Sequence, residues 1–195
     1  MNKAFLTIAT TILLSINISY ASQPNTEQTL GTNPFYKFGP IVTEDETGLK
    51  DELDRFWECI VKMDEQNADL NLQASLSTLI DKWIALDIAQ WKLFDTLDSG
   101  GSFQSDLYTE EMETASKMKD TAREEFHRAE AVAIQNWLLA KSSLSELAEE
   151  AQEAASEAND MAKEDPYKKT LMVVLSSYLI SSDPTQKTYF TDKKI

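Results

Sequence analysis

Apolar residues recur at alternating steps of four and three along most of this chain, the heptad pattern of helices that pack lengthwise on one another. The first stretch spans residues 49–99 and holds two such series: Leu49, Leu53, Phe56, Ile60 and Met63, then Leu72, Leu76, Leu79, Trp83, Leu86, Gln90, Leu93 and Leu97, in which Gln90 is the one polar member. A second apolar stripe, Ile80, Ile84, Ile88 and Trp91, predicts that the later half of this stretch is buried on more than one side.

The second stretch spans residues 102–165 and is rich in alanine. Its apolar positions are Ala122, Phe126, Ala129, Ala133, Trp137, Ala140, Leu144, Leu147, Ala151, Ala154, Ala158 and Met161. Alanine favours the helix but buries little area, so this stretch needs a closely packed neighbour.

Glycine and proline, the strongest breakers of regular structure, are absent from both stretches, and two glycines, Gly100 and Gly101, lie between the stretches. We therefore expect an antiparallel hairpin that reverses there, with Trp83 opposite Met118 and Leu72 opposite Ala129. We expect the first stretch to be continuous, although the polar patch Asn67–Asn71 would also suit a turn. In the second stretch, a capping box at Ser143–Glu146 would also suit the start of a new helix.

Asp165-Pro166 predicts a new, short helix from Tyr167 to Ser182. We expect it to fold back over the alanine-rich end of the hairpin; the alternative is that it docks into a partner or a second copy. The predicted fold class is therefore all-α: an elongated, coiled-coil-like antiparallel hairpin with a short C-terminal closing helix. The helical domain is expected at residues 48–182, followed by a flexible tail at 183–195.

The N-terminus has the charge, length and small residues of a secretory signal peptide, with cleavage expected after Ala21. Residues 1–21 are therefore the predicted signal, and residues 22–47 an extended leader whose aromatic cluster Phe35–Phe38 lies partly against the helices. The mature chain is expected in the periplasm or outside the cell, without a stable membrane anchor.

The formal net charge is −15, from 33 acidic and 18 basic residues. Such acidity disfavours nucleic acid, which selects a basic face, and favours basic protein partners. Acidic residues gather on one face of the alanine-rich segment: Glu146, Glu149, Glu150, Glu153, Glu157, Asp160 and Glu164. This row suits a solvated helix face, docking of a basic partner, or weak divalent-cation binding.

The chain has one cysteine and one histidine, which restricts the chemistry available to it. Cys59 is expected to be a buried small side chain, with an intermolecular disulfide in a homodimer as the alternative. Glu124 and His127 have the spacing of half a di-iron site, but no second histidine completes it. We therefore predict no metal, no cofactor and no catalytic residues.

These patterns predict an exported, non-enzymatic helical protein that acts by protein–protein interaction, as an adaptor, a structural subunit or a secreted host-interaction factor. In its layout, a signal peptide followed by long helical stretches, the chain is similar to the minor pilin subunits of type IV secretion systems. That resemblance implies an exported, all-helical, elongated subunit as the alternative. A helical-bundle enzyme or metal carrier is the third, disfavoured class.

Overall fold

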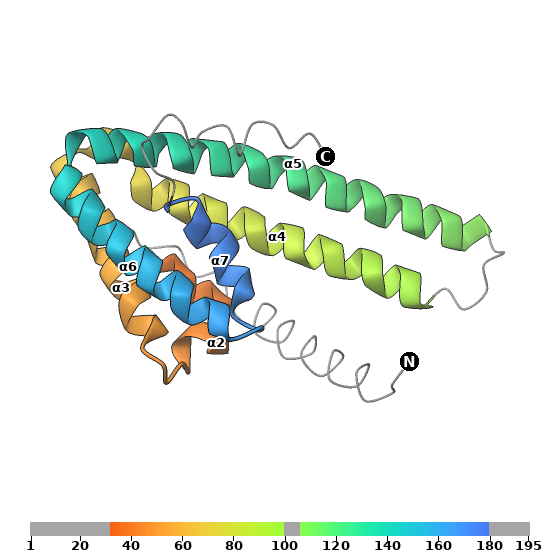
Figure 1. The fold of residues 1–195 in the computed structure, drawn as a ribbon. Coiled ribbons are helices and arrows are strands. Elements are labelled where there is room, and N and C mark those ends of the chain that lie inside the picture. Colours follow the sequence, from red (N-terminus) through yellow and green to blue (C-terminus); the bar gives the residue numbers. More distant parts are fainter. Residues whose placement is uncertain (1–31, 100–105, 180–195) are drawn as a thin grey trace.

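The computed structural model describes residues 32–99 and 106–179, and all regular structure within those ranges is helical. The predicted signal peptide, the Gly100-Gly101 reversal and the tail at 183–195 lie outside the described residues. The elements are η1 (Pro34–Phe38), α2 (Pro40–Thr43), α3 (Leu49–Gln66), η2 (Ala68–Leu70), α4 (Leu72–Ser99), α5 (Asp106–Ser143), α6 (Ser145–Glu164) and α7 (Lys169–Ser176). The chain is an all-α helical bundle (Figure 1).

Two helical pairs make up the bundle, α4 with α5 and α3 with α6. Figure 1 shows that α3 and α6 lie side by side and turn back from the end of the α4–α5 pair, with α7 in the angle between the pairs. The continuous helix expected over residues 49–99 is therefore wrong. Both long stretches break, and α5 passes to α6 at Leu144.

The first break is made by polar side chains that compete for the backbone. The carboxylate of Asp64 accepts hydrogen bonds from the N–H groups of Leu72 and Gln73, both at 2.8 Å, and so caps the start of α4. Asn71 takes the left-handed conformation, at φ 51°, which asparagine tolerates better than most residues. These contacts replace the glycine or proline that usually marks such a turn.

The second break follows a serine pair at the end of α5. The hydroxyls of Ser142 and Ser143 each donate to the carbonyl oxygen of Leu139 at 2.8 Å, a bond that competes with the helical ladder. A new helix starts here, as the capping-box alternative allowed, but Leu144 and not Ser143 precedes its first turn.

The register of the α4–α5 pair differs from the one expected. The ring of Trp83 packs on Phe126, with centroids 5.4 Å apart, and not on Met118. One residue earlier, Lys82 Nζ lies 2.8 Å from a carboxylate oxygen of Glu125. The shift is about one heptad, and a heptad shift leaves the same faces in contact.

The core lies where α3, α6 and α7 meet. Buried side chains of α3 face the alanines of α6, and the fully buried ring of Tyr178 follows α7 between Phe56 and Trp137, at 5.2 and 5.5 Å. The expectation that the closing helix covers the alanine-rich segment is confirmed, because α7 packs on α6. Its start was misplaced: α7 begins at Lys169, after a turn in which Asp165 accepts from the Tyr167 N–H.

The described part of the leader belongs to the bundle and is not extended. Residues 34–43 form η1 and α2, and Phe35 and Phe38 are buried in the core. Asn33 donates to the carbonyl oxygen of Leu53 at 3.2 Å and to Asp54 at 2.8 Å, which ties the segment to α3. Pro34 and Pro40 start these two short helices, because proline is favoured at the first helical position.

An ion pair joins the segment before α3 to the segment before α7. The Asp45 carboxylate, 1% exposed, accepts from the N–H groups of Thr47 and Leu49, both at 2.9 Å, and from the ammonium group of Lys168. Burial alone would raise the pKa of Asp45, but the Lys168 ammonium, the Thr47 hydroxyl and the Leu49 N–H together lower it below its usual value.

Candidate interaction surface

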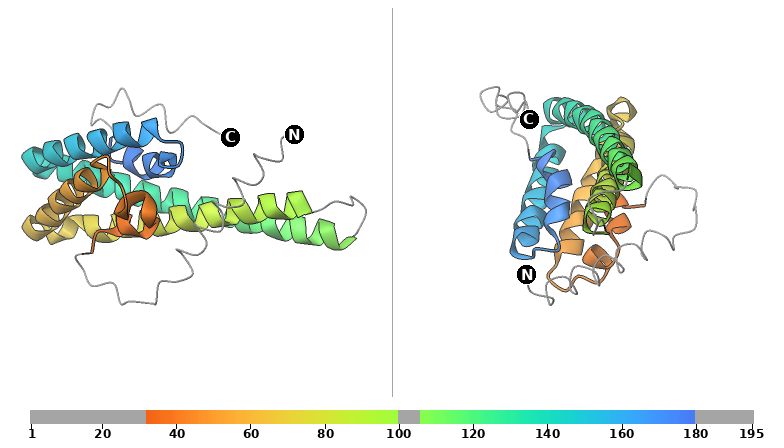
Figure 2. Two further views of the ribbon diagram at one scale, coloured as in Figure 1. Left: turned by 90° about the horizontal axis from the view of Figure 1, so that it is seen from below. Right: turned by 90° about the vertical axis from the view of Figure 1, so that its right-hand side faces the viewer.

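The α4–α5 pair continues beyond the rest of the bundle as a two-helix projection. Figures 1 and 2 show both helices running on past α7. We call residues 87–99 and 106–121 the arm. Inside it, Ala89 and Ala115 are buried where the two helices touch. Among residues 87–98 and 109–121, six large apolar side chains are exposed: Ile88, Trp91, Phe94, Leu97, Met112 and Met118.

Three of these side chains extend a face of α4 that is buried closer to the rest of the bundle. We call the described residues outside the arm the body. Ile80 is fully buried and Ile84 is packed against the core. Further along, Ile88, Trp91 and Phe94 are 44%, 37% and 60% exposed. The expectation that this whole stripe is buried on a second side is therefore wrong for its distal part. We call the side of α4 that carries Ile84, Ile88, Trp91 and Phe94 the outer face.

The two rings of the outer face lie against each other. The centroids of Trp91 and Phe94 are 6.2 Å apart with an interplanar angle of 63°, an edge-to-face contact. This contact joins the two rings into one aromatic surface on the outer face.

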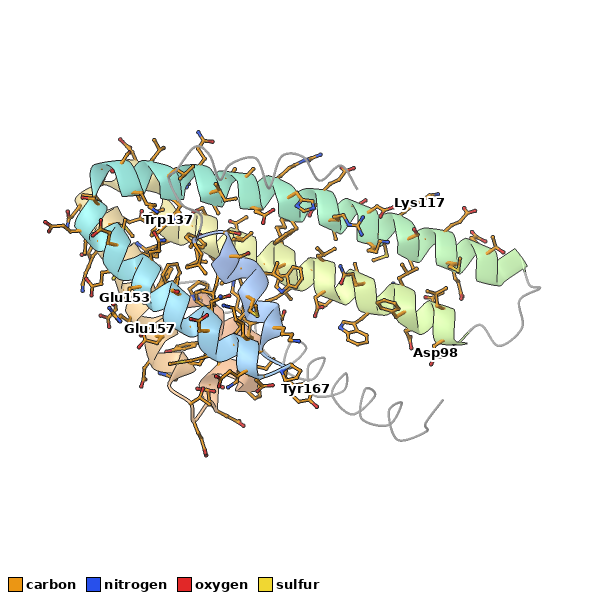
Figure 3. All side chains as sticks on the ribbon, in the orientation of Figure 1. Asp98, Lys117, Trp137, Glu153, Glu157 and Tyr167 are labelled. Atoms are coloured by element: carbon orange, nitrogen blue, oxygen red, sulfur yellow. The ribbon has the colours of Figure 1, made fainter. Side chains whose placement is uncertain are left out.

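Every charged side chain on the outer face is acidic. At 100° per residue, Asp87, Asp95 and Asp98 lie on the same side of α4 as Trp91. Figure 3 shows Asp98 at the end of α4, and Lys117 on α5, on the other side of the arm. Lys92 is turned toward α5, where its Nζ lies 3.9 Å from Met118 Sδ.

Asp87 lies closest to the body and is half-buried. Within residues 32–99 and 106–179 it forms no ion pair, and burial raises its pKa. A carboxylate that has lost part of its hydration without gaining a cation is better satisfied when a partner supplies one.

The acidic row predicted on α6 is exposed along its whole length, at Glu146, Glu149, Glu150, Glu153, Glu157, Asp160 and Glu164. Part of its charge is already compensated. Arg55 of α3 lies 2.6 Å from Glu153 and 3.7 Å from Glu157, and Lys163 lies 2.6 Å from Asp160. Figure 3 shows Glu153 and Glu157 together on the outside of α6. The row is a solvated face of α6, and no large apolar side chain of α6 is exposed.

Cys59 lies inside the packing of α3 and is 1% exposed. Burial raises the pKa of its thiol, and the charge of Glu150 on α6 adds to this effect. A disulfide to a second chain would require this region to open, since the sulfur does not reach the surface.

His127 is exposed and pairs with Glu130 at 3.2 Å, while Glu124 lies 3.4 Å from Arg128. Glu124 and His127, which have the spacing of half a di-iron site, therefore each contact a different neighbour. In the part of the chain that the structure describes, no group of three or more His, Cys, Asp or Glu side chains could hold a metal ion.

A shallow groove of about 430 Å³ lies between α4 and α5 within the body, lined among others by Ser75, Lys82, Glu125, Arg128 and Val132. Its charges are paired, Lys82 with Glu125 and Arg128 with Glu124. The groove therefore offers no uncompensated charge to a ligand. No helix among the described residues is long and apolar enough to cross a bilayer.

Comparison with known proteins gives no match to a family model, a curated protein or a solved structure. The similarity of layout to minor pilin subunits therefore stays a prediction.

The residues of the outer face were not recognised as a site from sequence. A signal was available: the apolar stripe of α4 continues to Trp91, which is longer than a short closing helix can cover. Acidic residues are interleaved with the distal part of this stripe, at Asp87, Asp95 and Asp98. They mark the same part of α4 as a candidate surface.

Proposed function

We propose that this chain is an exported, non-enzymatic helical protein that acts by protein–protein interaction, and that the outer face of the arm is its docking surface. One observation carries this: Ile88, Trp91 and Phe94 stay exposed in one row at the free end of α4. With side-chain areas of about 200 Å² each, they leave roughly 300 Å² of apolar surface in water, a patch of the size that commonly marks an interaction site.

Export rests on the signal-peptide pattern of residues 1–21. An adaptor and a structural subunit of a larger assembly both suit this design, because the arm holds the outer face away from the body. At 1.5 Å per residue, the 28 residues of α4 extend about 42 Å. The arm is the distal part of that length.

Site-specific photo-crosslinking in the cells that make the protein tests the proposal. The photoreactive amino acid p-benzoylphenylalanine replaces Phe94 in one variant and Leu139, which is 50% exposed on α5 outside the arm, in the control. We expect an adduct of higher mass at position 94 that weakens when Ile88→Ser is added, and none at position 139. Equal adducts at both positions, or none at 94, would contradict the proposal.

A further inference from the structure

We infer that the outer face of α4 takes a basic amphipathic helix of a partner protein. This inference rests on the proposed function and specifies what the docking surface recognises. It draws on three features of the arm: the shape of the apolar row, the sign of the charges beside it, and the way α4 is covered closer to the body.

The shape of the row suits a helix. Ile84, Ile88 and Trp91 follow steps of four and three, so they form a straight ridge along α4. Such a ridge packs into the groove between side chains of a second helix. Amphipathic helices that dock on apolar surfaces present anchors at this same spacing.

Closer to the body, α7 already packs on a neighbouring side of α4, the one that carries Trp83. Trp83 Nε1 donates to the hydroxyl of Thr170 on α7 at 2.7 Å, and α7 packs on α4 there. Figure 1 shows that α7 lies against the part of α4 nearer the body and leaves the arm uncovered. A partner helix on Ile88, Trp91 and Phe94 would lie along α4 beyond the part that α7 contacts.

The charges select the partner. Asp87, Asp95 and Asp98 lie on the same side of α4 as the apolar row, and the nearest cation on α4, Lys92, is turned toward α5. A helix with lysine or arginine beside its apolar face would place cations against these carboxylates, including half-buried Asp87. A second copy would instead bring three more carboxylates to the interface, in a chain whose net charge is already −15.

A pair of designed peptides tests the inference on the full chain. Both have 18 residues with leucine at heptad spacing; one carries lysine at the remaining positions and the other glutamate. Fluorescence anisotropy of the labelled peptides, in 150 mM salt, measures binding. We expect micromolar binding of the lysine peptide and at least 30-fold weaker binding of the glutamate peptide.

Apolar variants locate the binding site. Phe94→Ser and Ile88→Ser should each weaken the lysine peptide at least tenfold. Val132→Ser removes a side chain of α5 that is 51% exposed outside the arm, and should change binding less than twofold. All three side chains are exposed, so melting temperatures should stay within about 2 °C of the wild type.

Charge variants separate local recognition from the general acidity of the chain. The double variant Asp87→Asn, Asp98→Asn should weaken binding at least fivefold. The double variant Glu149→Gln, Glu150→Gln removes the same charge from α6 and should weaken it less than twofold. Equal effects of the two pairs, or binding that survives Phe94→Ser, would overturn the inference.

The outcomes for the inference and for the proposed function can be told apart. If the lysine peptide does not bind but position 94 still gives its adduct in cells, the inference fails and the proposed function stands. An adduct at twice the chain mass, with a dimer in sedimentation that Ile88→Ser dissociates, would place a second copy on the outer face and overturn the inference. Loss of both peptide binding and adduct would overturn the proposed function as well.

Discussion

Replacing Asp45 by alanine should destabilise the protein more than its position in a loop suggests. The carboxylate caps the start of α3 through the Leu49 N–H and binds Lys168, which is 11% exposed, in front of α7. Loss of a helix cap costs about 1 kcal/mol. Removing one partner of a buried pair costs about 3–5 kcal/mol. Lys168 keeps a second carboxylate, Asp165, at 3.9 Å, so we reduce the cost of breaking the pair to about 2 kcal/mol, which with the cap gives a total of about 3 kcal/mol.

The assay is urea unfolding at pH 7 followed by circular dichroism. For a chain of this size, a loss of about 3 kcal/mol corresponds to a fall of roughly 6–12 °C in melting temperature. Lys168→Met is the matched control, because Asp45 then still accepts from Thr47 and Leu49. We expect it to cost about 1–2 kcal/mol, since a hydrogen-bonded carboxylate remains. A loss under about 1 kcal/mol for Asp45→Ala would refute the reasoning.

The pH dependence gives an independent check. The pKa of Asp45 is lowered in the folded state, so its ionised form stabilises the fold. This stabilisation is complete above the unfolded pKa of about 4 and is lost as the pH falls through the lower folded value. The difference in unfolding free energy between wild type and Asp45→Ala should therefore be constant from about pH 8 to 5 and shrink below about pH 4. A difference that stays constant or grows on acidification contradicts the assignment.

Two further predictions concern the packing of α3 on α6. Cys59 should not react with a thiol reagent in native buffer and should give one thiol per chain after denaturation. The reason is that burial raises the pKa of the thiol and keeps the sulfur from the reagent. Rapid reaction in native buffer would contradict this prediction. Ala154→Leu should lower the free energy of unfolding in urea by about 1–3 kcal/mol, because the Ala154 side chain is fully buried in a close contact. The control Ser156→Leu, on the exposed side of α6, should lower it by less than about 0.5 kcal/mol. Similar losses for the two variants would show that the contact is loosely packed.

The heptad positions of the chain were predictable because burial has the helical period. Leu53, Phe56, Ala151 and Ala158 are fully buried, and all stand in the predicted stripes. It was harder to predict from the sequence which helices pair and in which register they pack. A heptad pattern does not distinguish a register from one shifted by seven residues, and the contact of Trp83 with Phe126 depends on where the reversal lies.

The helix breaks were predicted only as alternatives, for a different reason. Glycine and proline act through their own backbone, and their absence favours a continuous helix. At the first break, the turn depends on a contact eight residues apart in sequence, from Asp64 to Leu72, together with one left-handed asparagine. Side-chain capping over that distance depends on the turn that it stabilises, so a local pattern does not reveal it.

The apolar stripe of α4 predicted the core, but it did not distinguish the core from the candidate surface. Ile80 and Trp91 belong to one apolar stripe, yet Ile80 is fully buried and Trp91 is partly exposed. The difference is set by where other elements of the bundle stop covering α4, and α7 spans only Lys169–Ser176. Sequence periodicity shows which side of a helix is apolar, but not how much of it is covered.

The arm also behaves as a spacer whose length is independent of the core. Among the described residues its helices pack chiefly on each other, through alanines such as Ala89 and Ala115. Removing or adding one heptad in both helices would keep every side chain on its face and change the reach of the arm by about 10 Å, at 1.5 Å per residue. Evolution can therefore adjust how far the outer face stands from the body in steps of seven residues, without changing a contact in the core.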